Sequence, residues 1–141
     1  MENNEGYANC RFYVEIHQIT HAVFTEMGPL DIQTQVEDYA EGGNNSFIHK
    51  LPGHTRIGNV VLKFGLTNSM QLFQWYLKII QGKIDRRNVT VRVFAPDKKQ
   101  ITSWSFVNAF PVRWSGPQLL ADGMAVAIET LELAHEGLVL S

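Results

Sequence analysis

Alternation of apolar and polar residues with a period of two runs through most of this chain and restricts its fold more than any other feature. In the segment "RFYVEIHQI", Phe12, Val14 and Ile16 fall on one side of an extended backbone. The same pattern recurs in four further segments, which are residues 31–39, 59–65, 88–94 and 101–108. A period of two is that of a strand with one buried face. The sequence therefore predicts a mainly β protein.

One segment, "NSMQLFQWYLKIIQG", breaks this pattern. Its polar residues form one narrow stripe at helical spacing, namely Gln71, Gln74, Lys78 and Gln81. The residues around the stripe are apolar, as in a helix buried on most sides. We expect Asn68 to cap the N-terminus of this helix and Gly82 to end it. The prediction is one short helix over about residues 69–81, buried over most of its circumference, with Trp75 in the core.

The C-terminal run "MAVAIETLELAHEGLVL" is ambiguous on local evidence. Its Ala, Glu and Leu content favours a helix, whereas Val126, Ile128 and Thr130 alternate with their neighbours as in a strand. We prefer a strand, because an otherwise all-β chain needs partners for its other strands. The whole predicts a single domain over residues 1–141, an antiparallel β-sandwich or barrel with one helix. Residues 1–9 are expected to be a flexible segment.

Composition and charge exclude several classes of protein. The formal net charge is −2 and the pI about 6.2, so the chain has no basic field to hold nucleic acid. Its start lacks the basic and apolar regions of a signal peptide. No apolar run approaches the roughly 18 residues of a membrane helix. We therefore expect synthesis in the cytoplasm, no membrane insertion of its own and, with Cys10 as the single cysteine, no internal disulfide.

The sequence offers no motif for catalysis or ligand chemistry. The glycines of residues 42–46 lack the lysine and the following helix of a phosphate-binding loop. His49 and His54 flank a predicted turn without a clear third metal ligand. Glu129 and Glu132 would point to opposite faces of a strand and cannot act as a pair. We predict no catalytic residue, no cofactor and no metal site.

The later part of the chain is rich in apolar and aromatic residues. The segment "FVNAFPVRWSGPQLLADGMAVAI" contains Pro111 and Pro117, which we expect to interrupt it. A small sandwich with long strands also has open edges, which must be capped or paired. Self-association into a closed ring, by strand addition between subunits, would satisfy these edges.

Five segments occur in an order that is typical of one family. They are "YAEGGNNSFIHKLPG", "NVVLKFGLT" followed by a Trp-bearing helix, "DRRNVTVRVF", "WSFVNAFPVRWSGP" and "AVAIETLELAHEGL". From about Arg11 to Leu138 the chain resembles the tail tube protein family of contractile-tailed phages and contractile injection systems. The type VI secretion tube protein shares this architecture.

The resemblance implies a structural protein rather than an enzyme. Six copies would form a ring whose inner strands join into a continuous barrel around a lumen. Rings would stack into a hollow tube inside a contractile sheath, and contraction would drive the tube through a target envelope. The C-terminal run would be a strand. Implied partners are further copies of the chain, the sheath protein, baseplate or spike proteins and tube-terminating proteins. Cargo or DNA would pass through the lumen without specific binding.

The resemblance also implies an interface between subunits and between rings. The implied interface residues are Glu41, Gly42, Gly43, Asn44, Asn45, Lys50, Leu51, Pro52, Gly53 and Arg56. A further set of charged residues is expected either to be solvated or to form ion pairs at interfaces, namely Arg86, Arg87, Glu129, Glu132 and Glu136. Trp75, Trp104 and Trp114 are interpreted as core or subunit-boundary residues.

Two departures from the family pattern leave alternatives open. Ala40 stands where many relatives have Arg, and Gly123-Met124 stands where many have Asn-Glu. An alternative function is therefore a tube-initiator or baseplate adaptor ring of the same system. A more distant alternative is a small-ligand-binding β-barrel with a pocket around Trp75, Trp104 and Phe106. The particle would be assembled in the cytoplasm as a phage tail or a phage tail-like particle that is released or retained.

Overall fold

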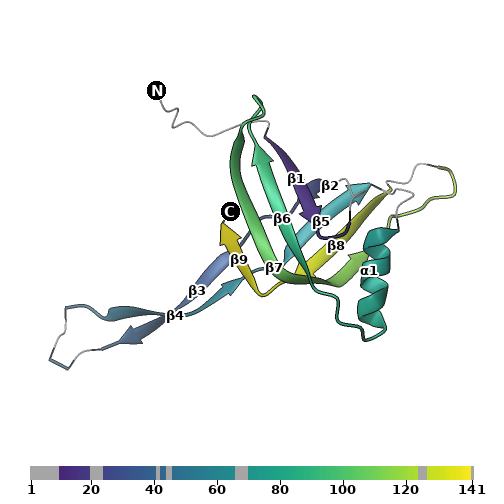
Figure 1. The fold of residues 1–141 in the computed structure, drawn as a ribbon. Coiled ribbons are helices and arrows are strands. Elements are labelled where there is room, and N and C mark those ends of the chain that lie inside the picture. The colour runs from purple at the N-terminus through teal and green to yellow at the C-terminus, as the bar shows by residue number, and fades with distance from the viewer. Residues whose placement is uncertain are drawn as a thin grey trace.

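The computed structural model describes residues 10–19, 24–40, 42–43, 46–65, 70–123 and 127–140. These residues form a mainly β fold with one helix (Figure 1), which confirms the predicted fold class. The strands are β1 (Arg11–Ile16), β2 (Phe24–Met27), β3 (Ile32–Tyr39), β4 (His49–Ile57), β5 (Val60–Gly65), β6 (Arg87–Phe94), β7 (Gln100–Ser115), β8 (Ile128–Ala134) and β9 (Gly137–Leu140). Helix α1 (Gln71–Ile80) lies between β5 and β6.

Strand β7 joins the two layers of a sandwich. Seven strands form one antiparallel sheet in the order β1-β6-β7-β8-β5-β2, and β9 also pairs with β7. The first part of β7 pairs with β6 and β9, and its last part pairs with β8. The sheet therefore has two halves, which fold over each other (Figure 1). Among the described residues the sheet is not closed into a barrel, because β1 and β2 stand at the ends of the strand order.

The period-two pattern supplies the core between the two layers. The largest fully buried side chains are Trp75, Phe106, Leu62, Leu131, Leu133, Val60, Val89, Val91 and Pro111. Leu131 and Leu133 belong to β8, so the C-terminal run contains the strand that the sequence favoured. Burying one Leu or Val side chain stabilises a fold by about 1.5–3 kcal/mol. In β5, β6 and β8 the apolar face therefore fixes which side of the strand faces inward.

Strand β7 bends at Asn108, where it passes from one layer to the other. Asn108 has a φ of +52°, and the pairing of β7 with β6 gains an extra residue on β7 at this point. The backbone N–H of Asn108 donates to Oδ1 of Asn88 at 3.1 Å, and the side-chain Nδ2 of Asn108 donates to the Glu136 carboxylate at 2.9 Å. An extra residue in the left-handed region is the geometry of a β-bulge, which bends a strand. Asn tolerates this conformation better than most residues.

The expectation that Pro111 interrupts this segment is wrong. Pro111 lies inside β7, and its side chain is fully buried. The pairing of β7 with β8 shifts register between Pro111 and Arg113. Because proline has no N–H to donate, it is tolerated in a strand where the ladder is irregular.

Helix α1 is shorter than predicted at both ends. It covers residues 71–80, and Met70 occupies the N-cap position without a side-chain hydrogen bond. The predicted cap, Asn68, lies outside the described residues. Gly82 does end the helix, with a φ of +82° and an N–H that donates to the Ile79 carbonyl at 3.0 Å. In the described part of the chain, no helix has the length and apolar character to cross a membrane.

The prediction that α1 is buried over most of its circumference is also wrong. Leu72 and Trp75 are buried against the core, but Leu77 and Ile80 are exposed. Leu77 and Ile80 are three residues apart and therefore lie on one face of the helix. The sequence pattern is that of a covered helix, but no described part of the chain covers this face.

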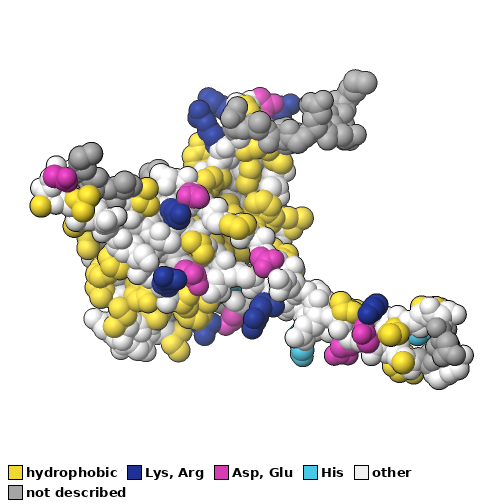
Figure 2. Space-filling model, turned by 180° about the vertical axis from the view of Figure 1, so that it is seen from behind, with side chains coloured by type: hydrophobic (Ala, Val, Ile, Leu, Met, Phe, Trp, Pro, Cys, Tyr) yellow, Lys and Arg dark blue, Asp and Glu magenta, His cyan; other side chains and the backbone are white. Residues whose placement is uncertain are grey.

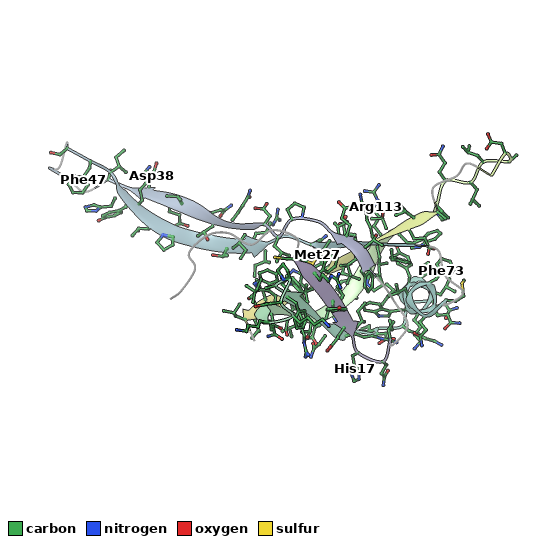
Figure 3. The ribbon with its side chains drawn as sticks, turned by 90° about the horizontal axis from the view of Figure 1, so that it is seen from above. His17, Met27, Asp38, Phe47, Phe73 and Arg113 are labelled. Carbon is green, nitrogen blue, oxygen red and sulfur yellow. The ribbon has the colours of Figure 1, made fainter. Side chains whose placement is uncertain are left out.

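Strands β3 and β4 form a separate two-stranded sheet that projects from the sandwich (Figures 1 and 3). This hairpin extends the β2–β5 pair. At its base the Gly28 N–H donates to the Val61 carbonyl at 2.8 Å, and the Gly58 N–H donates to the Asp31 carbonyl at 2.7 Å. The hairpin is thus anchored to the sandwich through backbone hydrogen bonds at its base.

The expectation of a turn between His49 and His54 is wrong, because both residues lie within one strand. The connection between the strands is limited to residues 40–48, and residues 49–57 form β4. Pro52 and Gly53 made this strand hard to predict from the sequence, because both residues are rare in strand interiors. The pairing of β3 with β4 shifts register between Thr34 and Val36. Pro52 and Gly53 therefore lie at an irregular part of the ladder.

Candidate assembly surface

The predicted interface residues of β4 are strand residues. They are Lys50, Leu51, Pro52, Gly53 and Arg56. Gly42 and Gly43 lie in the turn at the far end of the hairpin. Gly43 has a φ of +87°, a conformation that favours glycine. Glu41, Asn44 and Asn45 lie outside the described residues.

One face of the hairpin carries an aromatic and aliphatic patch. Tyr39 is directly opposite His49, and Glu37 is directly opposite Leu51. The Phe47 ring packs edge-on against the His49 ring at a centroid distance of 4.9 Å. We call Tyr39, Phe47, His49 and Leu51 the hairpin patch.

The other face of the hairpin combines an apolar pair with an ion pair near its tip. Val36 is opposite Pro52, and Asp38 is opposite Lys50. The Lys50 Nζ lies 2.6 Å from the Asp38 carboxylate. The two faces therefore offer different chemistry to a partner.

The hairpin exposes apolar side chains that no other described residue of its own chain covers. All eight residues of β3 are exposed. Val36 is 62% exposed and Phe47 is 58% exposed. A lone two-stranded hairpin is at best marginally stable in water, and contiguous exposed apolar surface marks interaction sites. The hairpin therefore has the properties of an arm that packs against another molecule.

A second apolar surface lies around helix α1, on the opposite side of the molecule (Figures 1 and 2). Ile80 is 64% exposed, and Ile84, in the loop after the helix, is 83% exposed. A pocket of about 160 Å³ beside them is lined by Ile79, Gly82, Lys83, Ile84, Arg86 and Phe110. We call Leu77, Ile80, Lys83, Ile84, Arg86 and Phe110 the helix flank.

Neither the hairpin patch nor the helix flank was singled out fully from the sequence. Tyr39, Phe47, Ile80 and Ile84 were missed as candidate contact residues. For the helix the signal was present, because a helix that is apolar around most of its circumference must be covered by something. For the hairpin it was the Phe47-Ile48 pair within an otherwise polar connection.

Most of the predicted ion-pair residues have partners within the chain. Arg86 pairs with Glu136 and also lies over the Phe110 ring at 5.0 Å from its centroid. Glu132 accepts a hydrogen bond of 2.9 Å from Asn59. Glu129 lies on β8 without an ion pair among the residues that the structure describes.

Arg87 is an internal residue, so its predicted availability at an interface is wrong. Its side chain is only 9% exposed and lies 3.0 Å from the Asp85 carboxylate. It also donates to the His17 carbonyl at 3.1 Å and lies over the Trp75 ring, 5.3 Å from the centroid. Arg87 therefore ties the loop after α1 to the end of β1.

This contact shifts the pKa of Asp85. The hydrogen bond from Arg87 is the largest influence and lowers the pKa of the Asp85 carboxyl below its usual range. Partial burial opposes the shift, and Lys78, whose Nζ lies 3.3 Å away, reinforces it. The cluster holds the loop in place, since its groups face one another rather than a cleft.

The three tryptophans pack into or against the core. Trp75 is fully buried, and its Nε1 donates to the Asp85 carbonyl at 2.7 Å. Trp104 and Trp114 are partly buried and pack against the core cluster. The Trp114 ring also meets the Phe73 ring of α1 edge-on at 5.1 Å. A further role of Trp104 and Trp114 at a subunit boundary stays a prediction.

The described residues contain no group of three His, Cys, Asp or Glu side chains placed to hold a metal ion. His49 and His54 both lie on β4. Glu129 and Glu132 lie on opposite faces of β8, since their separation is odd.

Comparison with known proteins agrees with this geometry. A family described as T4-like virus tail tube protein gp19 matches residues 8–139. The chain belongs to this family. No curated protein sequence matches it. The match covers nearly the whole sequence, so the tail tube family assignment holds for both the sandwich and the hairpin.

Solved structures share the tail tube fold. A chain in the anti-feeding prophage cap, the tube-terminating cap, has a TM-score of 0.83 and 20% identity, covering 100% of this chain and 94% of its own. A chain in the sheath-tube complex of PVC, an extracellular contractile injection system, has a TM-score of 0.81 and 22% identity, covering 98% and 93%. Hcp1 from Flavobacterium johnsoniae has a TM-score of 0.63 and 14% identity, covering 92% and 94%. At these identities the likeness concerns the fold.

Proposed function

We propose that this tail tube family protein is the subunit of the inner tube of a contractile injection system or contractile phage tail. Copies of the chain form hexameric rings, and the rings stack into a hollow tube. A contracting sheath drives the tube through a target envelope. The observation that carries the proposal is the hairpin, which is held out from the sandwich with its apolar side chains uncovered.

Other features of the fold support assembly from many copies. Strands β1 and β2 end the strand order without a further partner among the described strands. An edge strand with free backbone groups is satisfied by pairing or covering. In a closed ring, every copy contacts one neighbour through one surface and the other neighbour through a different surface. Each edge strand and each hairpin can therefore be covered by a neighbouring copy.

The proposed interface includes the hairpin residues that the family resemblance pointed to. Lys50, Leu51 and Arg56 are exposed on β4, where they can contact a neighbouring subunit or the adjoining ring. Gly42 and Gly43 sit in open space at the turn, since a Cβ at either position would meet nothing within 4 Å. We propose that the turn allows close approach of another backbone there.

The partners follow from the proposed role. The relatives are part of structures described as a sheath-tube complex and a tube-terminating cap. By analogy this chain contacts a sheath protein along the tube, baseplate or spike proteins at one end and terminating proteins at the other. Cargo or DNA passes through the lumen without specific recognition. The role is mechanical, and the particle is assembled in the cytoplasm.

The fold gives no support to the ligand-binding barrel. That function needs an interior pocket around Trp75, Trp104 and Phe106. Trp75 and Phe106 are instead fully buried and fill the space between the layers. The sheet is also open between β1 and β2 in the described part of the chain.

Electron microscopy of the purified full-length chain tests the proposal. Negative-stain images at increasing protein concentration should show rings of six subunits and stacks of rings, and size-exclusion chromatography should show a hexamer. Rings that never stack would indicate an adaptor ring rather than the main tube. Monomers that persist at high concentration, with no rings in any buffer, would overturn the proposal.

A further inference from the structure

We propose that the hairpin patch of one copy docks on the helix flank of the next copy in the ring. This inference rests on the proposed function, because it names the partner surface of the interface proposed there. The occupant of the helix flank is thus a second copy of this chain, contributing Tyr39, Phe47, His49 and Leu51.

The positions of the two surfaces fit a head-to-tail contact. The hairpin leaves the sandwich on one side, and α1 lies on the opposite side (Figure 1), as the view from above also shows (Figure 3). A ring is built from heterologous contacts, in which one surface of each copy meets a different surface of its neighbour. Two complementary surfaces on opposite sides of one subunit satisfy this requirement.

The two surfaces also match in chemistry. Hydrophobic side chains gather on the outer part of the hairpin and on the side where α1 lies (Figure 2). The helix flank exposes Ile80 and Ile84 beside a pocket lined by Phe110. An aromatic or Leu side chain from the hairpin patch can enter this pocket, and buried apolar area contributes about 25 cal/mol per Å².

Charge complementarity indicates the orientation of the contact. Glu37 lies on the same face as the hairpin patch, because it is directly opposite Leu51. Lys83 lines the pocket of the helix flank. Neither Glu37 nor Lys83 makes an ion pair within the part of the chain that the structure describes. Docking of the patch on the flank brings these two charges to the same interface.

The helix itself gives an independent reason for a cover on this side. Leu72 and Trp75 are buried on the side of α1 that faces the core. Tyr76 connects the helix to β7, because its hydroxyl donates to the Val112 carbonyl at 3.2 Å. The face with Leu77 and Ile80 has no such cover in the described chain. The polar stripe of Gln71, Gln74, Lys78 and Gln81 leaves this face apolar. A second copy completes the burial that the sequence pattern predicts.

Cysteine cross-linking tests the contact. In a Cys10→Ser background, Leu51→Cys and Ile84→Cys are combined in one chain and treated with a short bismaleimide after assembly. The expected result is loss of the monomer band and a ladder of linked species that ends at the hexamer. The control combines Val36→Cys with Ile84→Cys, since Val36 lies on the other hairpin face and should leave the monomer band unchanged.

A charge exchange gives a second readout. Glu37→Lys or Lys83→Glu alone should raise the protein concentration needed for ring formation by up to about fivefold, and the double exchange should restore it. Rings that assemble normally without any Leu51–Ile84 link overturn this inference and leave the proposed function standing. Failure of the unmodified chain to form rings overturns both.

Discussion

Replacing Arg87 with methionine tests how the loop after α1 is held. The Arg87 guanidinium donates to Asp85 at 3.3 and 3.0 Å and to the His17 carbonyl at 3.1 Å. Methionine has a similar length but donates nothing, so Asp85 and the His17 carbonyl lose the hydrogen bonds from Arg87. Removing one partner of a buried ion pair costs about 3–5 kcal/mol. Because Asp85 keeps 23% exposure and retains Lys78, we expect about 3 kcal/mol, the low end of this range.

Urea unfolding followed by tryptophan fluorescence measures this loss on the monomer. A thermal melt should show a decrease in Tm of roughly 6–12 °C, which is the size that this free energy predicts for a domain of this length. Glu26→Gln is the control. Its exposed pair with Lys63, at 3.5 Å, should contribute less than about 1 kcal/mol. An Arg87→Met variant no less stable than the control would refute the reasoning.

The same pair predicts the direction of a pH effect. The pKa of Asp85 is lower in the folded chain than in an unfolded one, so the folded state takes up a proton there less readily. The stabilisation is therefore fully present above the ordinary Asp pKa of about 4 and is lost as the pH falls through the lower folded-state value. The stability difference between the native chain and Arg87→Met should shrink below about pH 4. A difference that stays constant down to pH 2.5 would contradict the assignment.

Substitutions at two positions and one deletion test the backbone. Gly82→Ala should lower the free energy of unfolding by about 1 kcal/mol or more, because the φ of +82° disfavours a side chain; urea unfolding measures it. Asn108→Ala should cost more than Asn108→Gly, since glycine accepts the left-handed conformation; equal losses in urea would assign the whole effect to the lost hydrogen bonds. Deleting Gly43 to Ser46 should leave the circular dichroism spectrum of the monomer intact while impairing ring stacking in electron micrographs. A deletion that unfolds the monomer would show that the turn is needed for folding.

The strands of the sandwich were predictable because each buries one face of alternating residues. The segments containing Val14, Leu62 and Val91 became β1, β5 and β6 with bounds shifted by a few residues. The local pattern left the C-terminal run open between helix and strand; the family resemblance implied a strand, and the pairing with β5 and β7 shows one. Short β2 was missed because its four residues are too few to show a period.

The candidate site was harder to predict, because it depends on what one chain leaves uncovered. Pro52 and Gly53 marked β4 as a loop, and only its pairing with β3 shows otherwise. Arg87 looked like a surface cation beside Arg86, since no sequence pattern reveals that Asp85 and the His17 carbonyl lie around it. The apolar pattern of α1 predicted burial over most of its circumference, whereas Leu77 and Ile80 are exposed. A periodic pattern shows that a face is apolar, but it does not show what packs against that face.

The long strand β7 gives the sandwich resistance to shear. One continuous stretch of backbone belongs to both layers, and Asn108 turns it from one to the other with its bend hydrogen-bonded to Asn88 and Glu136. The layers therefore cannot slide past each other unless β7 loses its backbone hydrogen bonds to β6, β8 or β9. In the proposed tube, a load applied to the outer layer during contraction passes through covalent bonds to the inner layer. The two layers of the tube wall would then move together.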